Sequence, residues 1–557
     1  MTPDPYARIP ISPLSSSPAP DLKAEREVRW PGWARADGGR RIAAWGVACL
    51  ALLAIAIGVW QLEHARQGVD ITAHRVGTMP VTVFRPAQPT GPPPVVLIAH
   101  GFAGSQQLMQ PFALTLSRNG YVAITFDLPG HGRNATPMTG GLASQQESLR
   151  VLLKALGEMG AYVGQLAGTG HLSGRYALVG HSMASDIVVR HAQSHPEVQA
   201  TVGVSLFAPS IDAASPPDSP RNLLVIGGGL EPQMMAAEAL RVVGRVAGPT
   251  VALDQTYGRF ADGTARRATL SPGVEHIGVL YSAHTLSESL AWLDAAFARP
   301  PAQGPFIDAR GPWLGLLLFG VVALAWPLSN MLPRVSRSLP LTGALQRPSW
   351  RAWRRQSALA LAPAVLTPLL LWKLPTDFLP LLLGDYLALH FALYGALTLA
   401  GLAWAGHKMP PANAFALVVA IALASAWALL AVGVPIDRYV FNMRPESVRL
   451  PLIAALCVGT LPYFLADEWF TRGTGAAPGA YSVSKLCFLL SLVAAIALNP
   501  QRLFFLAIIV PAILLLFVVY GLFSRWIGLA SGHPAVAAVA NALAFGTFIA
   551  VTFPLVA

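Results

Sequence analysis

The chain has 557 residues, of which 54% are hydrophobic and only 12% are charged, about half the charged share of an ordinary soluble protein. This composition excludes both a disordered chain and a wholly soluble enzyme, because too few polar residues exist to cover so much apolar bulk in water. The formal net charge is +11. No basic run is interleaved with aromatic residues, so the excess indicates membrane topology and no nucleic-acid partner. Three cysteines, all in apolar stretches, provide neither a disulfide framework nor a thiolate metal cluster.

The N-terminal part predicts a tail and a membrane anchor. Residues 1–40 are rich in Pro and Ser and then basic, which is typical of a disordered cytoplasmic tail. Residues 42–61 are continuously apolar over the length of a membrane span, and we expect a transmembrane anchor. A cleaved signal peptide is the alternative, but the segment is long, lies far from the first residue and lacks an A-x-A site.

A soluble segment and a second apolar region follow. Residues 63–311 have soluble composition and suffice for one domain, whereas 312–557 form a polytopic transmembrane domain of about eight helices. The expected spans are 312–331, 357–374, 378–406, 414–436, 450–466, 481–499, 501–523 and 533–556.

Arginines predict the orientation of these spans. The loop 332–356 carries six arginines and no acidic residue, which places it in the cytoplasm together with the basic N-terminus. The segment 63–311 then lies on the extracytoplasmic side of a cytoplasmic (inner) membrane. The loop 437–449 conflicts with this count, because it holds Arg438, Arg444 and Arg449 yet falls on the outer side.

Short buried strands alternate with helical stretches through residues 63–311, which predicts an α/β fold with a doubly wound, mostly parallel sheet. The expected strands are a pair within 71–86, then 95–99, 121–127, 176–180, 200–208, 222–227 and 268–273. The expected helices are 142–167, 185–194 and 287–298.

A cluster of motifs within about 95–298 resembles the α/β-hydrolase superfamily. The segment Gly180-His181-Ser182-Met183-Ala184 follows a strand and is similar to the nucleophile elbow G-x-S-x-G, with Ala in the last position. The earlier strands end in His100-Gly101-Phe102 and in Asp127-Leu-Pro-Gly-His-Gly, where the family has its oxyanion loop and a usual turn. The resemblance implies an α/β-hydrolase domain, and the apolar spans predict an all-α transmembrane helix bundle beside it.

The resemblance also implies a serine hydrolase of the esterase or lipase type. Ser182 would be the nucleophile, His276 the base and Glu231 the acid, in the family's order Ser, acid, His. A histidine takes the serine proton as the hydroxyl attacks a carbonyl, and a carboxylate holds the imidazole in the required tautomer. The N–H groups of Phe102 and Met183 would form the oxyanion hole.

Alternatives remain at each position. Ser182 could be a helix N-cap. His284 competes with His276 for the base, and Asp254 and Asp262 compete with Glu231 for the acid, because either aspartate precedes the last strand.

Other expectations concern partners and the membrane half. The sequence contains no metal or cofactor motif. The expected partners are membrane lipids and an acyl substrate, which is either a small molecule or lipid-like. The sequence leaves the oligomeric state open. Only about a dozen residues, 209–221, occupy the position of the family's usual lid. Asp385 and His390 could flank a cavity within the membrane or only join helices. A peptidase, amidase or acyltransferase, or a transport-type bundle with an appended hydrolase, is the alternative function.

Overall fold

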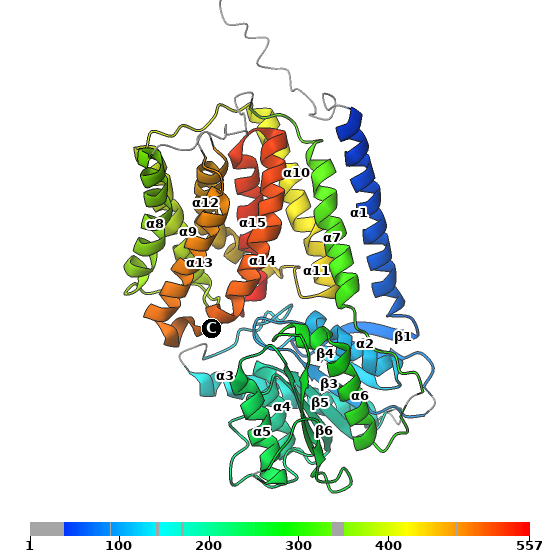
Figure 1. The fold of residues 1–557 in the computed structure, drawn as a ribbon. Helices are drawn as coiled ribbons and strands as arrows, with labels where there is room; N and C mark the ends of the chain where they lie inside the picture. The colour runs from blue at the N-terminus through cyan, green and yellow to red at the C-terminus, as the bar shows by residue number, and fades with distance from the viewer. Residues whose placement is uncertain are drawn as a thin grey trace, which may run out of the picture.

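The computed structural model describes residues 38–557 except 90, 141–143, 169–171, 249, 302, 337–349 and 474–475. Of the predicted tail, only residues 38–40 are described, and they already belong to the first helix. Figure 1 shows two layers, a bundle of long helices and a sheet covered by helices on both sides.

The sheet of the second layer is mostly parallel. Its described strands are β1 (Val69–Val76), β2 (Met79–Pro86), β3 (Val95–Ala99), β4 (Val122–Phe126), β5 (Tyr176–His181), β6 (Val198–Val204), β7 (Leu223–Gly228), β8 (Thr256–Tyr257) and β9 (Arg266–Ser271). They lie in the order β1-β2-β4-β3-β5-β6-β7-β9-β8. From β4 through β9 all neighbours pair in parallel, while β1, β2 and β8 pair antiparallel. The predicted doubly wound sheet is therefore confirmed.

Burial on both faces explains the sequence of the central strands. All five residues of β3 and of β4 are buried, so both read as unbroken apolar runs. Helices α2 (Gln110–Arg118) and α6 (Ala283–Ala296) contribute to the core on one face. Helices α3 (Gln145–Gly168), α4 (Met183–Ser194) and α5 (Gln233–Ala247) pack on the other face.

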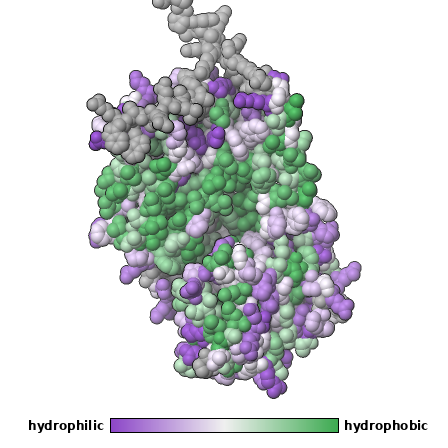
Figure 2. Space-filling model, in the orientation of Figure 1, coloured by the Kyte–Doolittle hydropathy of each residue, from purple (hydrophilic) through white to green (hydrophobic). Residues whose placement is uncertain are grey.

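The first layer contains the apolar helices. They are α1 (Gly38–His64), α7 (Gly311–Ser329), α8 (Trp350–Leu371), α9 (Gly384–Trp404), α10 (Ala414–Ala426), α11 (Gly433–Tyr439), α12 (Leu450–Arg472), α13 (Ala480–Leu498), α14 (Pro500–Ser531) and α15 (Pro534–Thr552). A π-helical turn, Trp427–Ala431, lies between α10 and α11. Figure 2 shows the hydrophobic belt over this layer.

Eight helical stretches among the described residues are long and apolar enough to cross a membrane. They match the predicted anchor and seven of the eight later spans, and this agrees with a multi-pass membrane protein. The remaining span, 357–374, coincides with α8, which is helical but is not among the eight. Helices α12 and α14 extend beyond the predicted 450–466 and 501–523, to Arg472 and Ser531.

Other differences concern short or amphipathic elements. The prediction did not include α5 or the two-residue strand β8. The strand expected over 200–208 begins and ends earlier, as β6, and the one expected over 268–273 does the same, as β9. The other predicted strands and helices agree with the structure to within a few residues.

Several contacts join the two layers. The Leu555 N–H donates to the Gly130 carbonyl at 2.8 Å, and the Met138 N–H donates to the Leu555 carbonyl at 2.9 Å, so the C-terminal segment lies along the loop after β4. The Arg449 guanidinium donates to the same Gly130 carbonyl at 2.7 Å. Arg438 pairs with Glu63 at the end of α1, with its Nε 2.7 Å from Oε1. Arg449 thus binds the second layer and Arg438 binds the end of α1, which gives a physical reason for two of the three arginines of loop 437–449 on this side of the bundle.

Candidate active site

Ser182 lies at a sharp turn between β5 and α4. Its backbone has φ 52° and ψ −116°, a strained conformation for a residue with a side chain. A Cβ at Gly180 would lie 2.6 Å from the Ala184 carbonyl oxygen and 2.6 Å from Val188 Cγ2, so strand and helix approach closely here. Ser182 occupies the N-cap position of α4, but its hydroxyl makes no capping bond. The turn instead presents the hydroxyl at the carboxyl end of the sheet.

The Ser182 hydroxyl meets the imidazole of His276. His276 Nε2 lies 2.9 Å from Ser182 Oγ, and His276 Nδ1 lies 2.5 Å from Glu231 Oε1. With the proton on Nδ1, the imidazole donates to Glu231 and accepts from the serine hydroxyl. Ser182, His276 and Glu231 lie on three separate loops and are joined by these two hydrogen bonds. The three side chains together are called the row.

Glu231 is held as a carboxylate. Its side chain is only 2% exposed, whereas that of His276 is 31% exposed. Burial raises the pKa of Glu231, but hydrogen bonds from His276, from the Gly228 N–H at 2.6 Å and from Ser205 Oγ at 3.0 Å outweigh it, so that the pKa lies below its usual value. Ser205, a partner that the sequence did not reveal, follows β6 directly.

The competing residues lie elsewhere. Asp254 Oδ1 and His284 Nε2 both bond Thr269 Oγ1, at 2.6 and 3.0 Å. Asp262 is exposed beside Arg259, with 3.4 Å between Oδ2 and the guanidinium Nε. Within the described residues, none of the three side chains is hydrogen-bonded to Ser182, His276 or Glu231.

His181 connects the elbow to the loop of the base. Its Nε2 lies 3.0 Å from the His276 carbonyl oxygen, and the two rings are 4.9 Å apart. Burial, helped by the neighbouring His276, lowers the pKa of His181 to about 3, so the ring is neutral and donates through Nε2. The His276 backbone is thereby fixed beside Ser182.

The two expected oxyanion residues flank Ser182. A Cβ at Gly101 would lie 3.0 Å from Ser182 Cβ and 2.9 Å from His181 Nδ1, so the loop after β3 is pressed onto the elbow. Neither the Phe102 nor the Met183 N–H donates a hydrogen bond to another described residue. Both donors remain available to an oxygen atom bound at Ser182.

Buried groups hold this loop in shape. The Leu128 N–H donates to His100 Nε2 at 3.1 Å, and Asp127 Oδ1 accepts from the Gln106 N–H at 2.8 Å. Burial lowers the pKa of His100 and, to about 3, that of His131. These neutral rings lie 5.2 Å apart between the two loops.

The helix bundle covers the oxyanion loop. The Phe102 ring lies 4.4 Å from the ring of Phe505 in the second turn of α14. Ala103 and Tyr281 also pack against the core of the bundle. In place of a lid domain, residues 209–221 form turns and irregular backbone, without a helix. The bundle contact was not predictable from sequence, since over 400 positions separate the two rings.

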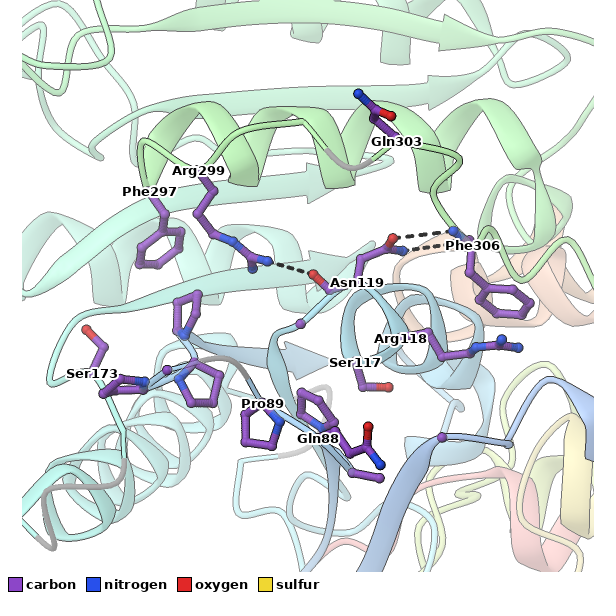
Figure 3. Close-up of a pocket in the computed structure, with 18 of the residues that line it drawn as sticks. Gln88, Pro89, Ser117, Arg118, Asn119, Ser173, Phe297, Arg299, Gln303 and Phe306 are labelled. Atoms are coloured by element: carbon purple, nitrogen blue, oxygen red, sulfur yellow. Dashed lines mark hydrogen bonds between the residues drawn. The ribbon is translucent and has the colours of Figure 1, made fainter.

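A groove lies at the amino ends of β3 and β4, opposite the strand ends that carry the Ser182 turn. It has a volume of about 1080 Å³ and is lined by residues that precede β3 and β4, as Figure 3 shows. Asn119 bonds there to Arg299 and Phe306, with donor–acceptor distances of 2.7 and 2.8 Å. No group of three or more His, Cys, Asp or Glu side chains in the described ranges is placed to hold a metal ion.

Asp385 and His390 have separate partners. Asp385 accepts from the N–H groups of Phe378 and Tyr386, at 2.8 and 2.9 Å, whereas His390 Nε2 lies 3.2 Å from Ser491 Oγ. His390 thus joins α9 to α13, whereas Asp385 binds backbone groups at and just before the start of its own helix.

A larger ionic cluster lies within the bundle. Lys485 Nζ is 2.6 Å from Asp467 Oδ2, and Arg472 Nε is 3.1 Å from Glu468 Oε2, with all four side chains buried or nearly so. Both acids lie near the end of α12, yet both are buried inside the bundle. Lys485, in an apolar stretch, was not singled out as their partner.

Comparisons with known proteins agree with the fold. Residues 90–246 match a family model described as serine aminopeptidase, S33. The strand order and this match identify the second layer as a hydrolase domain of the α/β-hydrolase type. No curated protein matches the chain.

Similar solved structures cover the same region. A dienelactone hydrolase from Anabaena variabilis shares 18% identity over 41% of this chain and 98% of its own, with a TM-score of 0.30. A bacterial membrane phospholipase A shares 14% identity over 46% and 96%, with a TM-score of 0.30. An epoxide hydrolase from Vigna radiata shares 14% identity over 41% and 98%, with a TM-score of 0.29.

Proposed function

We propose that this protein is a membrane-bound serine hydrolase that cleaves carboxylic esters through Ser182, His276 and Glu231. The observation that carries the proposal is the hydrogen-bonded row, with 2.9 Å between Ser182 Oγ and His276 Nε2 and 2.5 Å between His276 Nδ1 and Glu231 Oε1. Both distances lie in the range expected for a nucleophile, a base and the group that orients the base.

The reaction begins with attack of Ser182 Oγ on the ester carbonyl carbon. The serine proton moves to His276 Nε2, and Glu231 stabilises the imidazolium. The N–H groups of Phe102 and Met183 receive the oxygen as it becomes negative, a contribution of about 3 kcal/mol for each donor in comparable sites. His276 then protonates the leaving alkoxide as the carbon–oxygen bond breaks, and an acyl-serine remains.

Water completes the cycle. His276 takes a proton from a water molecule that attacks the acyl carbon, and the same proton returns to Ser182 Oγ as the carboxylic acid leaves. Atoms and charges balance with water as the only co-reactant. Metal ions and cofactors have no part in this scheme.

Labelling with a fluorophosphonate probe tests the nucleophile. The wild-type protein should label, Ser182→Ala should not, and Ser194→Ala at the other end of α4 should label as the wild type does. Ser194 bonds only to atoms of its own helix and the adjoining His195, which makes it a control in the same element. Equal labelling of Ser182→Ala would refute the assignment.

Peptide hydrolysis is a second candidate, and the family model described as serine aminopeptidase favours it. The same row of residues can cleave an amide, provided that His276 protonates the leaving amine. Paired assays with p-nitrophenyl butyrate and alanine p-nitroanilide would separate the two. Because an activated ester is intrinsically more reactive than an anilide, Ser182-dependent hydrolysis of the anilide supports the peptidase, and hydrolysis of the butyrate without any of the anilide supports the esterase.

The orientation in the membrane is part of the proposal. Arg40 and Arg41 at the start of α1 and the arginines of 332–356 favour the cytoplasm for the side of the bundle away from the hydrolase layer. The hydrolase domain then faces the extracytoplasmic side. A membrane-impermeant fluorophosphonate applied to intact cells should label Ser182 if the domain is outside and should fail if it is inside.

A further inference from the structure

Four large hydrophobic side chains are exposed on the hydrolase layer, and all four lie beside the proposed catalytic row. Among described residues from 65 to 310, the exposed ones are Phe207 (54% exposed), Leu230 (66%), Met234 (63%) and Ile277 (42%). Together they are called the apolar rim. Scattered exposed hydrophobic residues are ordinary, but their confinement to the surroundings of one site indicates a binding surface.

Each member of the rim is tied to the site through the backbone. The Phe207 N–H donates to Ser185 Oγ at 3.4 Å, and Ser185 donates to the Ser182 carbonyl at 2.5 Å. Leu230 precedes Glu231, and its N–H donates to the Val274 carbonyl at 3.0 Å, in the loop that carries His276. Ile277 follows His276 directly, and Met234 is the second residue of α5, three residues after Glu231.

On the other side of Ser182 the apolar surface reaches the bundle. Gly101 presses against the elbow, and the neighbouring Phe102 ring lies 4.4 Å from Phe505. Phe504, beside it on α14, is exposed. Aromatic side chains of the bundle therefore contact the loop that packs on Ser182, and the apolar rim surrounds the loops that carry Glu231 and His276.

We propose that the apolar rim binds the hydrocarbon chain of the acyl group of a membrane-resident ester while the ester carbonyl lies at Ser182. The inference rests on the proposed function and names its substrate class. Such an ester partitions into the leaflet next to the hydrolase layer, and the chain covers hydrophobic side chains that no described segment of the protein covers. Burial of one methylene group against such a surface favours binding about two- to fourfold.

A series of p-nitrophenyl esters tests the rim. The full chain in lipid nanodiscs is assayed with the acetate, butyrate, octanoate and decanoate, in the wild type and in Leu230→Gln/Ile277→Gln. In the wild type, kcat/KM should rise about two- to fourfold per methylene over part of the series. In the double variant, the ratio of decanoate to acetate should fall about tenfold or more. The conservative pair Leu230→Met/Ile277→Val should keep the wild-type ratio.

The possible outcomes distinguish a failure of the apolar rim from a failure of the proposed esterase function. An unchanged decanoate-to-acetate ratio in the double variant, with hydrolysis still dependent on Ser182, overturns the rim but leaves the esterase. Hydrolysis of the acetate that survives in Ser182→Ala overturns the proposed function itself. Loss of fluorophosphonate labelling in the double variant would mean that the site itself is damaged. The decanoate-to-acetate ratio is then measured in Met234→Gln, because Met234 lies on α5 and not in the loop that carries His276. A fall of its ratio supports the rim, and an unchanged ratio refutes it.

Discussion

The ring of Phe102 in the hydrolase layer lies 4.4 Å from the ring of Phe505 in the helix bundle, with an angle of 32° between their planes. Phe102 is also the residue whose N–H we assign to the oxyanion hole. The helix bundle is therefore in direct contact with the proposed catalytic machinery. Arg449 and Leu555 hold the adjoining loop through Gly130, so the bundle supports both loops next to the hole.

Phe505→Ala should lower kcat for ester hydrolysis about three- to tenfold, with a smaller change in KM. An aromatic pair contributes about 0.5–1.5 kcal/mol beyond area burial, and its loss lets the Phe102 loop move from the position that suits the transition state. Phe415→Ala is the control, because Phe415 is an exposed phenylalanine on α10 without a ring contact to any described residue of the site. If both variants behave alike in steady-state kinetics, Phe505 has no positioning role.

Gly101→Ala should reduce kcat/KM at least a hundredfold while the domain stays folded. The added Cβ would lie 2.9 Å from His181 Nδ1 and 3.0 Å from Ser182 Cβ, so the elbow and the loop would have to separate. Gly157→Ala in α3 is the control, because nothing lies within 4 Å of its Cβ position. That control should be active and slightly more stable, by about 0.5–1 kcal/mol, as expected for Ala in place of Gly inside a helix. Comparable loss of activity in both variants would contradict the crowding argument.

The pKa of His181 predicts a stability change in mild acid. The folded-state pKa is about 3, because burial disfavours the charged ring, whereas an unfolded histidine has a pKa of about 6.5. The unfolded chain thus binds the proton first. The stabilisation is fully present above about pH 6.5 and is lost as the pH falls from there towards 3.

His181→Gln should therefore flatten the pH dependence of unfolding between about pH 6.5 and 4. Glutamine can still donate to the His276 carbonyl but does not titrate. Thermal unfolding followed by tryptophan fluorescence across this range, on the full chain in nanodiscs, provides the measurement. Parallel curves for the variant and the wild type would show that His181 is not buried neutral.

Local patterns made most of the hydrolase layer predictable. Strands such as β3 and β4 are buried on both faces, so their sequences are unbroken apolar runs. The turn Gly180–Ala184 needs small residues around a serine, and this constraint identified the elbow. The pairing of His276 with Glu231 followed from the order of residues in the resembling family, and the structure places these side chains 2.5 Å apart.

Contacts between distant segments were not predictable in the same way. The C-terminal Leu555 binds Gly130, and Phe505 packs on Phe102. Neither contact is accompanied by a hydrophobic pattern in the sequence that would predict it. Acidic residues near the end of a span ordinarily reach water, but Asp467 and Glu468 are buried. Lys485, far along the chain, makes burial of Asp467 possible, and only the packing of α12 on α13 reveals this partnership.

Lys485→Met should destabilise the bundle by about 3–5 kcal/mol, because Asp467 would remain buried without a compensating charge. Lys485 Nζ lies 2.6 Å from Asp467 Oδ2 and donates to Tyr463 Oη at 3.3 Å, so one substitution leaves several groups unpaired. Lys485→Met/Asp467→Leu removes both charges and should recover much of the loss. The exposed pair of Arg150 and Glu147 is the control, and Glu147→Ala should cost less than about 1 kcal/mol. Thermal unfolding in detergent compares the variants. A Lys485→Met midpoint equal to that of Glu147→Ala would mean that the buried pair does not hold α12 to α13, and a role in moving ions across the bundle would then become the better explanation for charges at this depth.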